Sequence, residues 1–228
     1  LEARRAGQTQ AVTSLDLGRS TLTVTLSEQG GIFPDGTLLR WQDAATIAAT
    51  PNVCFALRDG AWEPIRIFSA TTGWVRSLYP TAGAPTTLVA GFAMHRIKAI
   101  DPWEDTRRKV RALGPVVGRV LDTATGLGYT AILAARSAQE VVTVERDPAA
   151  IELARLNPWS RELFDQARIR LIIGDVSEVI QEFADASFSR VIHDPPAFAL
   201  AGELYSGAFY RQLYRVLKPG GRLFHYLG

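Results

Sequence analysis

Apolar and polar residues follow different patterns in the two halves of the chain. Residues 20–26 alternate polar and apolar side chains with period two, which is typical of a strand with one buried face. From residue 119 onward, short continuous apolar runs alternate with stretches of helical periodicity. Continuous runs indicate strands that are buried on both faces. We therefore predict a β-rich N-terminal domain over residues 1–100 and an α/β domain over residues 101–228.

The second half predicts a Rossmann-like, doubly wound, mostly parallel sheet. Repeated strand–helix units imply right-handed crossovers between parallel strands. A helix over residues 102–113 opens the domain, with Asp101 as N-cap, Pro102 at the first position and Glu104 completing a capping box. The strands are predicted at residues 119–123, 140–145, 169–173, 189–193 and 221–227, and the helices at 129–137, 148–157, 177–183 and 205–217.

The N-terminal half shows turns but no chemical motif. Asp59 and Gly60 are a good hairpin turn pair, and we expect residues 53–57 and 65–68 to be its two strands. Residues 43–49 suit one short helix. We expect this domain either to shape a substrate pocket or to serve as a scaffold.

Composition excludes several classes of protein. Lys and Arg number 25 and Asp and Glu 23, so the formal net charge is +2 and charge alone does not indicate a nucleic-acid binder. The single cysteine, Cys54, excludes an intramolecular disulfide and a cysteine-built zinc site. No apolar run approaches the roughly 18–20 residues of a membrane span, and the first residues show no signal-peptide pattern. We expect a cytoplasmic protein that neither crosses a membrane nor needs a metal.

Acidic residues follow the first four predicted strands of the second half. Asp122, Glu145, Asp175 and Asp194 stand at or directly after these strand ends. In a doubly wound sheet, ligands bind outside the carboxyl ends of the strands. The sequence therefore places its functional candidates at one edge of the sheet.

The loop after the first of these strands contains two glycines. Gly126 and Gly128 let the backbone turn tightly and approach a ligand without interference from a Cβ. With Ala131, their spacing also fits a dinucleotide fingerprint in which Glu145 would hold a ribose. Asp122 disfavours a nicotinamide enzyme, because a carboxylate in this loop would oppose a pyrophosphate and suits the ammonium group of an amino acid.

Two motifs carry a family resemblance: Thr-Gly-Leu-Gly-Tyr-Thr-Ala at residues 125–131 and His-Asp-Pro-Pro at residues 193–196. Residues 116–228 resemble a class I S-adenosylmethionine-dependent methyltransferase, and the whole chain resembles an uncharacterised group of prokaryotic predicted methyltransferases with both motifs. The resemblance implies S-adenosyl-L-methionine as cofactor, with Glu145 on the ribose hydroxyls, Asp175 on the adenine amine and Val176 over the ring. Ala124 stands where the family has its first glycine. The implied cofactor-binding set is Asp122, Ala124, Gly126, Gly128, Tyr129, Glu145, Arg146, Asp175, Val176 and Asp194.

The fourth strand end indicates the chemistry. Amino-group methyltransferases carry Asp or Asn, Pro-Pro and an aromatic residue here. Hydrogen bonds from an acceptor NH₂ to the Asp194 carboxylate and the Pro195 carbonyl would draw the nitrogen toward tetrahedral geometry and stabilise its developing positive charge. This sequence departs from the family pattern because Phe198 follows one residue later than the family's aromatic. We predict Asp194, Pro195 and Phe198 as catalytic residues and His193 as a packed strand-end residue.

The sequence alone leaves the methyl acceptor and two competing functions open. The methyl acceptor is a nucleic acid, a protein or a small amine. A polyamine aminopropyltransferase-like enzyme would join a β-rich N-terminal domain to the same core, but the paired acidic catalytic motif is missing. A non-catalytic S-adenosylmethionine-binding module is the third candidate. We expect Asp147 to cap a helix, Asp175 to be left to the ligand because Ser177 offers another cap, and the native protein to extend beyond residue 228.

Overall fold

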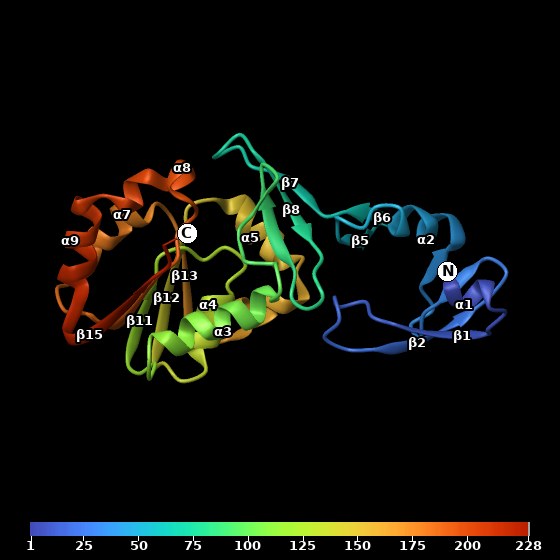
Figure 1. Cartoon of the computed structure of the whole chain (residues 1–228), viewed down its shortest axis with the longest axis horizontal. Helices are drawn as coiled ribbons and strands as arrows, with labels where there is room; N and C mark the ends of the chain where they lie inside the picture. The colour runs from blue at the N-terminus through green and yellow to red at the C-terminus, as the bar shows by residue number, and fades with distance from the viewer. Residues whose placement is uncertain (228) are drawn as a thin grey trace.

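The computed structural model describes residues 1–227, and its C-terminal half is a sheet of five parallel strands with helices on both faces (Figure 1). The strand order is β13-β12-β11-β14-β15, so the order reverses beside β11, the first strand of this sheet in the chain. This confirms the predicted Rossmann-like fold. The strands are β11 (Arg119–Asp122), β12 (Glu140–Glu145), β13 (Ile169–Ile173), β14 (Phe188–His193) and β15 (Leu217–His225).

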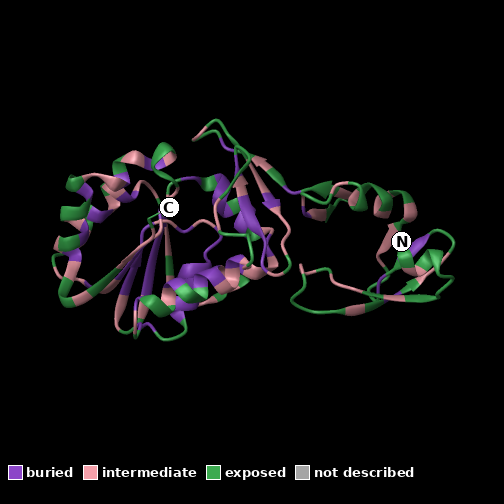
Figure 2. Cartoon of the chain, in the orientation of Figure 1, coloured by how far each residue is buried: buried purple, intermediate pink, exposed green. Residues whose placement is uncertain are grey.

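Two apolar cores lie on the two faces of this sheet, because successive side chains of a strand point to opposite sides. Helices α3 (Pro102–Ala112), α4 (Tyr129–Ala135), α5 (Pro148–Arg155) and α6 (Arg161–Asp165) contribute to the first core. Helices α7 (Val176–Val179), α8 (Phe198–Ala201) and α9 (Gly207–Val216) contribute to the second. Figure 2 shows the buried residues concentrated in the central strands and α4. The first core holds Val120, Val141 and Ile192, and the second holds their chain neighbours Leu121, Val142 and Val191.

The predicted helix caps are confirmed in part. The Asp101 carboxylate accepts hydrogen bonds from the backbone N–H groups of Trp103 and Glu104, at 2.9 and 3.2 Å. The Glu104 side chain pairs with Arg107 and Arg108 on the surface of α3 instead of closing a capping box. The predicted helix over 177–183 divides into α7 and a 3₁₀ turn, Ile180–Glu182. Within residues 1–227, no helix has both the length and the apolar character of a membrane span.

The N-terminal half is β-rich, as predicted, and all its strand pairs are antiparallel. An outer sheet and helix α2 (Trp41–Ala48) lie farthest from the α/β domain (Figure 1). The outer sheet comprises β1 (Gln10–Thr13), β2 (Leu22–Leu26), β3 (Gly30–Ile32) and β4 (Leu38–Arg40), preceded by α1 (Glu2–Arg5); an inner sheet comprises β7 (Arg66–Phe68), β8 (Val75–Tyr79), β9 (Thr86–Val89) and β10 (Phe92–Ala93).

The predicted hairpin has the right turn and the wrong second strand. Asp59 and Gly60 both adopt positive φ, +49° and +81°, and connect β5 (Phe55–Arg58) directly to β6 (Ala61–Pro64). A two-residue turn of this kind fixes the pairing of the residues beside it. Strand β7 therefore pairs with β8 in the inner sheet.

The inner sheet packs against the α/β domain near the carboxyl ends of its strands. Leu78 of β8 shares the first apolar core with Leu127 and Tyr129. The Tyr129 hydroxyl donates to the Pro85 carbonyl oxygen at 2.9 Å. These contacts place N-terminal side chains beside the strand ends where the sequence predicts a ligand.

Candidate functional site

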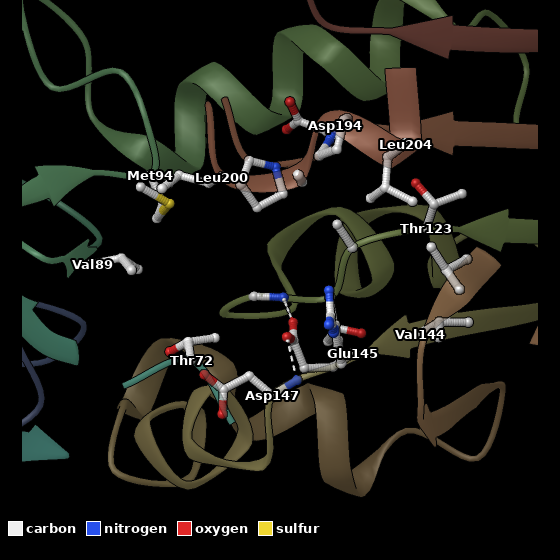
Figure 3. Close-up of a pocket in the computed structure, with 18 of the residues that line it drawn as sticks. Thr72, Val89, Met94, Thr123, Val144, Glu145, Asp147, Asp194, Leu200 and Leu204 are labelled. Atoms are coloured by element: carbon white, nitrogen blue, oxygen red, sulfur yellow. Dashed lines mark hydrogen bonds between the residues drawn. The ribbon is translucent and has the colours of Figure 1, made fainter. Parts of the chain in front are cut away.

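A cavity of about 180 Å³ opens at the carboxyl ends of the parallel strands, between the sheet and the inner N-terminal sheet. Figure 3 shows Asp194 at one side of it and Glu145 with Asp147 at the other. The structure thus brings strand-end side chains from β12, β13 and β14 around one space. The predicted site residues that line it are Ala124, Gly126, Tyr129, Glu145, Arg146, Asp175, Val176, Asp194 and Pro195.

The Glu145 carboxylate is held by backbone groups. One oxygen accepts from the Gly126 N–H at 2.8 Å and the other from the Asp147 N–H at 3.0 Å (Figure 3). Gly126 has φ of +52°, a conformation that favours glycine. Burial nevertheless raises the pKa of Glu145, because loss of water outweighs the two N–H bonds. The carboxylate is therefore preorganised at the cavity wall, where a ribose partner is predicted.

Asp175 both caps a helix and lines the cavity. One of its oxygens accepts from the backbone N–H and the hydroxyl of Ser177, at 2.9 and 2.6 Å. The expectation that Ser177 would cap α7 is thus wrong, because Ser177 is the hydrogen-bond donor. The second oxygen lies 3.5 Å from the Arg146 guanidinium, which also approaches Glu203 at 3.3 Å. Arg146 consequently bridges two acidic residues at the edge of the cavity.

Asp122 lies beneath the glycine loop and is not among the residues that line the cavity. It is fully buried, and one of its oxygens accepts from the hydroxyls of Thr130 and Thr143, at 2.8 and 3.0 Å. Burial raises the pKa of this carboxyl to about 7. In this position Asp122 ties the start of α4 to β12 and supports the loop from behind.

Gly128 and Phe198 also lie outside the cavity lining. Gly128 has φ of +78°, and a Cβ there would lie 2.7 Å from the Leu163 side chain, so this glycine permits close packing of α6. Phe198 is 69% exposed on α8, with its ring 5.6 Å from that of Tyr205. The structure does not bring Phe198 to Asp194, because the extra residue, Ala197, separates it from the proline pair.

A second cavity of about 370 Å³ adjoins the first at Asp194, Pro195 and Pro196, which line both. Its other walls come from the loop around β10, from α3, from the segment 197–205 that contains α8, and from the chain after β15. Its aromatic lining consists of Phe92, Tyr205 and Tyr226 together with the His95 ring.

Lys109 of α3 forms an ion pair with Asp194 that the sequence reasoning missed. Its Nζ lies 2.7 Å from Asp194 Oδ2 and 3.3 Å from Asp105 Oδ2. The same ammonium lies 4.5 Å from the centre of the Tyr226 ring. Burial raises the pKa of Asp194, and the Lys109 charge and hydrogen bond oppose that rise. The available signal was the four-residue spacing of Asp105 and Lys109, which puts both on one face of the predicted helix.

The inner N-terminal sheet supplies further lining residues without a sequence motif. Trp74, Arg76, Val89 and His95 all line the first cavity. Arg76 forms an ion pair with Asp147 at 2.6 Å, while Asp147 also caps α5 through the Ala149 N–H, as predicted. These strands pair with each other and meet the α/β domain only through tertiary packing. The spacing of these residues in the sequence therefore does not predict that they line the cavity.

His193 is a packed residue, in agreement with the prediction. Its Nε2 donates to the Leu204 carbonyl oxygen at 3.0 Å, and its Nδ1 lies 2.7 Å from the Thr123 hydroxyl. The side chain is fully buried, and this burial lowers its pKa to about 4. Both ring nitrogens are used in holding β14 against its neighbours.

This burial predicts a loss of stability in mild acid. His193 stays neutral in the folded chain, whereas in the unfolded chain it gains a proton as the pH falls through about 6.5. The contribution of neutral, buried His193 to the free energy of unfolding is therefore fully present above pH 6.5 and is lost as the pH falls toward 4. Replacing His193 with Gln should therefore reduce the drop in unfolding free energy between pH 7.5 and 4.5 by about 2–3 kcal/mol, measured by urea titration. The other titrating groups are the same in the native chain and in His193→Gln. An equal drop in unfolding free energy in the two chains would therefore contradict the role given to His193.

Comparison with known proteins agrees with the parallel sheet and its acidic strand ends. Residues 120–221 match the family model described as a methyltransferase domain, a range that includes Asp122, Glu145, Asp175 and Asp194. This match supports a methyltransferase domain in the second half of the chain.

Relatives extend the likeness to the N-terminal half. An uncharacterised protein of Methanocaldococcus jannaschii, MJ1233, is 46% identical over 197 residues, 86% of this chain and 66% of that protein. A polyamine aminopropyltransferase of Aeropyrum pernix is 32% identical over 107 residues, 45% of this chain and 34% of that enzyme. A spermidine synthase solved with the transition-state analogue AdoDATO has a TM-score of 0.57 and 17% identity, and covers 92% of this chain and 61% of its own. The last shows a shared fold, and this chain spans two thirds or less of each of the three.

Proposed function

Proceeding from the methyltransferase domain in residues 120–221, we propose that this chain transfers a methyl group from S-adenosylmethionine to a nitrogen atom beside Asp194. The observation that carries the proposal is that Asp194, Pro195 and Pro196 line both cavities. A cofactor in the first cavity and an acceptor in the second would meet at this motif. Holding the two reactants in such contact supplies much of the acceleration of a transfer reaction.

The charges of the first cavity suit a cationic cofactor. Among the described residues that line it, the formally charged ones are two basic and five acidic, so acidic groups predominate. Glu145 is the candidate partner for the ribose hydroxyls, Asp175 for the adenine amine and Val176 for the ring face. The bound cofactor supplies an electrophilic methyl group on a positively charged sulfur. The charged lining residues are Arg76, Arg146, Glu145, Asp147, Asp175, Asp194 and Glu203.

Asp194 would act on the acceptor through hydrogen bonding and charge. Its Oδ2 faces Lys109, and we assign Oδ1 to an N–H of the acceptor. The Pro195 carbonyl would accept the second N–H. As the nitrogen would gain the methyl group, the methyl–sulfur bond would break, S-adenosylhomocysteine would leave and the nitrogen would become positive until its proton passes to water. The preorganised Asp194 Oδ1 and Pro195 carbonyl oxygen would stabilise this transient charge through hydrogen bonds from its N–H groups. His193 takes no part, because both its ring nitrogens already have partners.

A second candidate is transfer of an aminopropyl group. Its support is the fold shared with a spermidine synthase over 92% of the chain, which includes the β-rich half. Such an enzyme would take decarboxylated S-adenosylmethionine and an alkyl diamine. The absence of the paired acidic motif from the sequence makes it the weaker proposal.

One experiment separates the two. The chain is incubated with methyl-labelled S-adenosylmethionine and, in parallel, with decarboxylated cofactor and 1,4-diaminobutane, each with RNA, protein and metabolite fractions of cells. Methyl transfer yields S-adenosylhomocysteine and a labelled acceptor, whereas aminopropyl transfer yields methylthioadenosine. We expect the native chain to yield S-adenosylhomocysteine and a labelled acceptor, and the Asp194→Ala variant to lose both products. Methylthioadenosine in the second reaction, with no labelled acceptor in the first, would contradict the proposal.

A further inference from the structure

Four charged side chains form a linked group beside the second cavity. Lys109 Nζ lies 2.7 Å from Asp194 and 3.3 Å from Asp105, and the Arg96 guanidinium lies 3.7 Å from the other oxygen of Asp105. Asp105 and Lys109 are buried, with 3% and 7% of their surfaces exposed. Buried charges are tolerated only when they are paired, so each of these residues depends on its charged partners.

The group has no net charge before an acceptor binds. Two carboxylates face one ammonium and one guanidinium. Among the described residues that line the second cavity, the formally charged ones are Arg96, Lys109 and Asp194. The His95 ring adds no positive charge near neutral pH, because burial lowers its pKa to about 3. This cavity therefore offers an incoming cation no unpaired carboxylate and places two positive groups near it.

We propose that Lys109 determines which acceptors enter: by neutralising Asp194 it selects an uncharged nitrogen, such as an amide or the exocyclic amine of a ring, and excludes alkylammonium cations. This inference rests on the proposed nitrogen methylation and names the acceptor class for that same site. A protonated amine at Asp194 would lie against the Lys109 ammonium, and like charges repel. A planar group would meet the aromatic rings of Phe92, Tyr205 and Tyr226, which line the same cavity.

Binding of 1,4-diaminobutane, a dication at neutral pH, tests the proposal without needing the true acceptor. Isothermal titration in the presence of S-adenosylhomocysteine compares the native chain with Lys109→Met, Lys109→Arg and the double variant Lys109→Met/Asp194→Asn. We expect Lys109→Met to bind the diamine at least about tenfold more tightly than the native chain, since it leaves two carboxylates without the ammonium between them. Lys109→Arg keeps the charge and should behave as the native chain, and the double variant should lose the gain. A gain of the same size in Lys109→Arg, or its persistence in the double variant, would overturn the role of the Lys109 charge.

The native chain by itself can overturn the inference, even if Lys109→Met fails to fold. Its dissociation constant for the diamine should be larger than about 1 mM, and a smaller dissociation constant would contradict the selection. The products then tell which proposal fails. Methylation of the diamine from S-adenosylmethionine would overturn the acceptor class and leave nitrogen methylation standing, whereas aminopropylation from the decarboxylated cofactor would overturn the proposed function.

Discussion

Asp194→Ala is expected to lower the single-turnover rate of methyl transfer by a factor of about 10²–10³, and to change cofactor affinity much less. The variant removes the carboxylate that faces the acceptor nitrogen at the junction of the two cavities. Asp194→Asn keeps an oxygen that accepts a hydrogen bond, so it should retain more activity than Ala. Both variants remove the charge that pairs with Lys109, which makes Asn the matched control for effects of that ion pair on the fold.

The measurement requires an identified acceptor and separates transfer from binding. Single-turnover rates are compared at saturating cofactor, with cofactor affinity determined in parallel. His193→Ala should reduce transfer less than Asp194→Ala, because no base has to act before the methyl group moves. If Asp194→Ala transfers methyl groups at the native rate, the Asp-Pro-Pro motif only ends the strand.

Glu145→Ala is expected to weaken S-adenosylmethionine binding by roughly 1.5–3 kcal/mol, about tenfold to more than a hundredfold in dissociation constant. The lost interactions are charge-assisted hydrogen bonds to the ribose. Glu145 also fixes the N–H groups of Gly126 and Asp147, so its removal loosens the glycine loop as well. Both consequences act in the same direction on affinity.

Calorimetry checks this expectation with a control from the same strand. Glu140 lies at the other end of β12 and pairs with Arg119, away from the cavity. Glu140→Ala should leave cofactor affinity unchanged. Equal affinity of the native and Glu145→Ala chains would remove Glu145 from the ribose role.

Local patterns predicted the parts of the structure that depend on nearby residues. Continuous apolar runs located β11, β12 and β14, because a strand buried on both faces must be apolar on both. The edge strands β13 and β15 are only partly buried, and β15 begins at Leu217, four residues before the predicted start at residue 221. Asp101 and Asp147 were identified as caps, since each side chain reaches N–H groups two or three residues ahead. The same reasoning was wrong for Asp175, where two neighbouring side chains were both suitable as caps and their geometry decided between them.

The pattern of strands along the chain is enough to place the acidic residues at one edge of the sheet, because parallel strands bring their carboxyl ends together whatever lies between them in the chain. What these residues contact depends on how the folded elements pack. Lys109 meets Asp194 from 85 positions away, and Arg76 meets Asp147 from 71. The tertiary structure also decided that Asp122 lies behind the loop while Glu145 faces the cavity. Such contacts depend on how separate helices and strands pack together. They have no characteristic spacing along the chain, so a sequence pattern does not predict them.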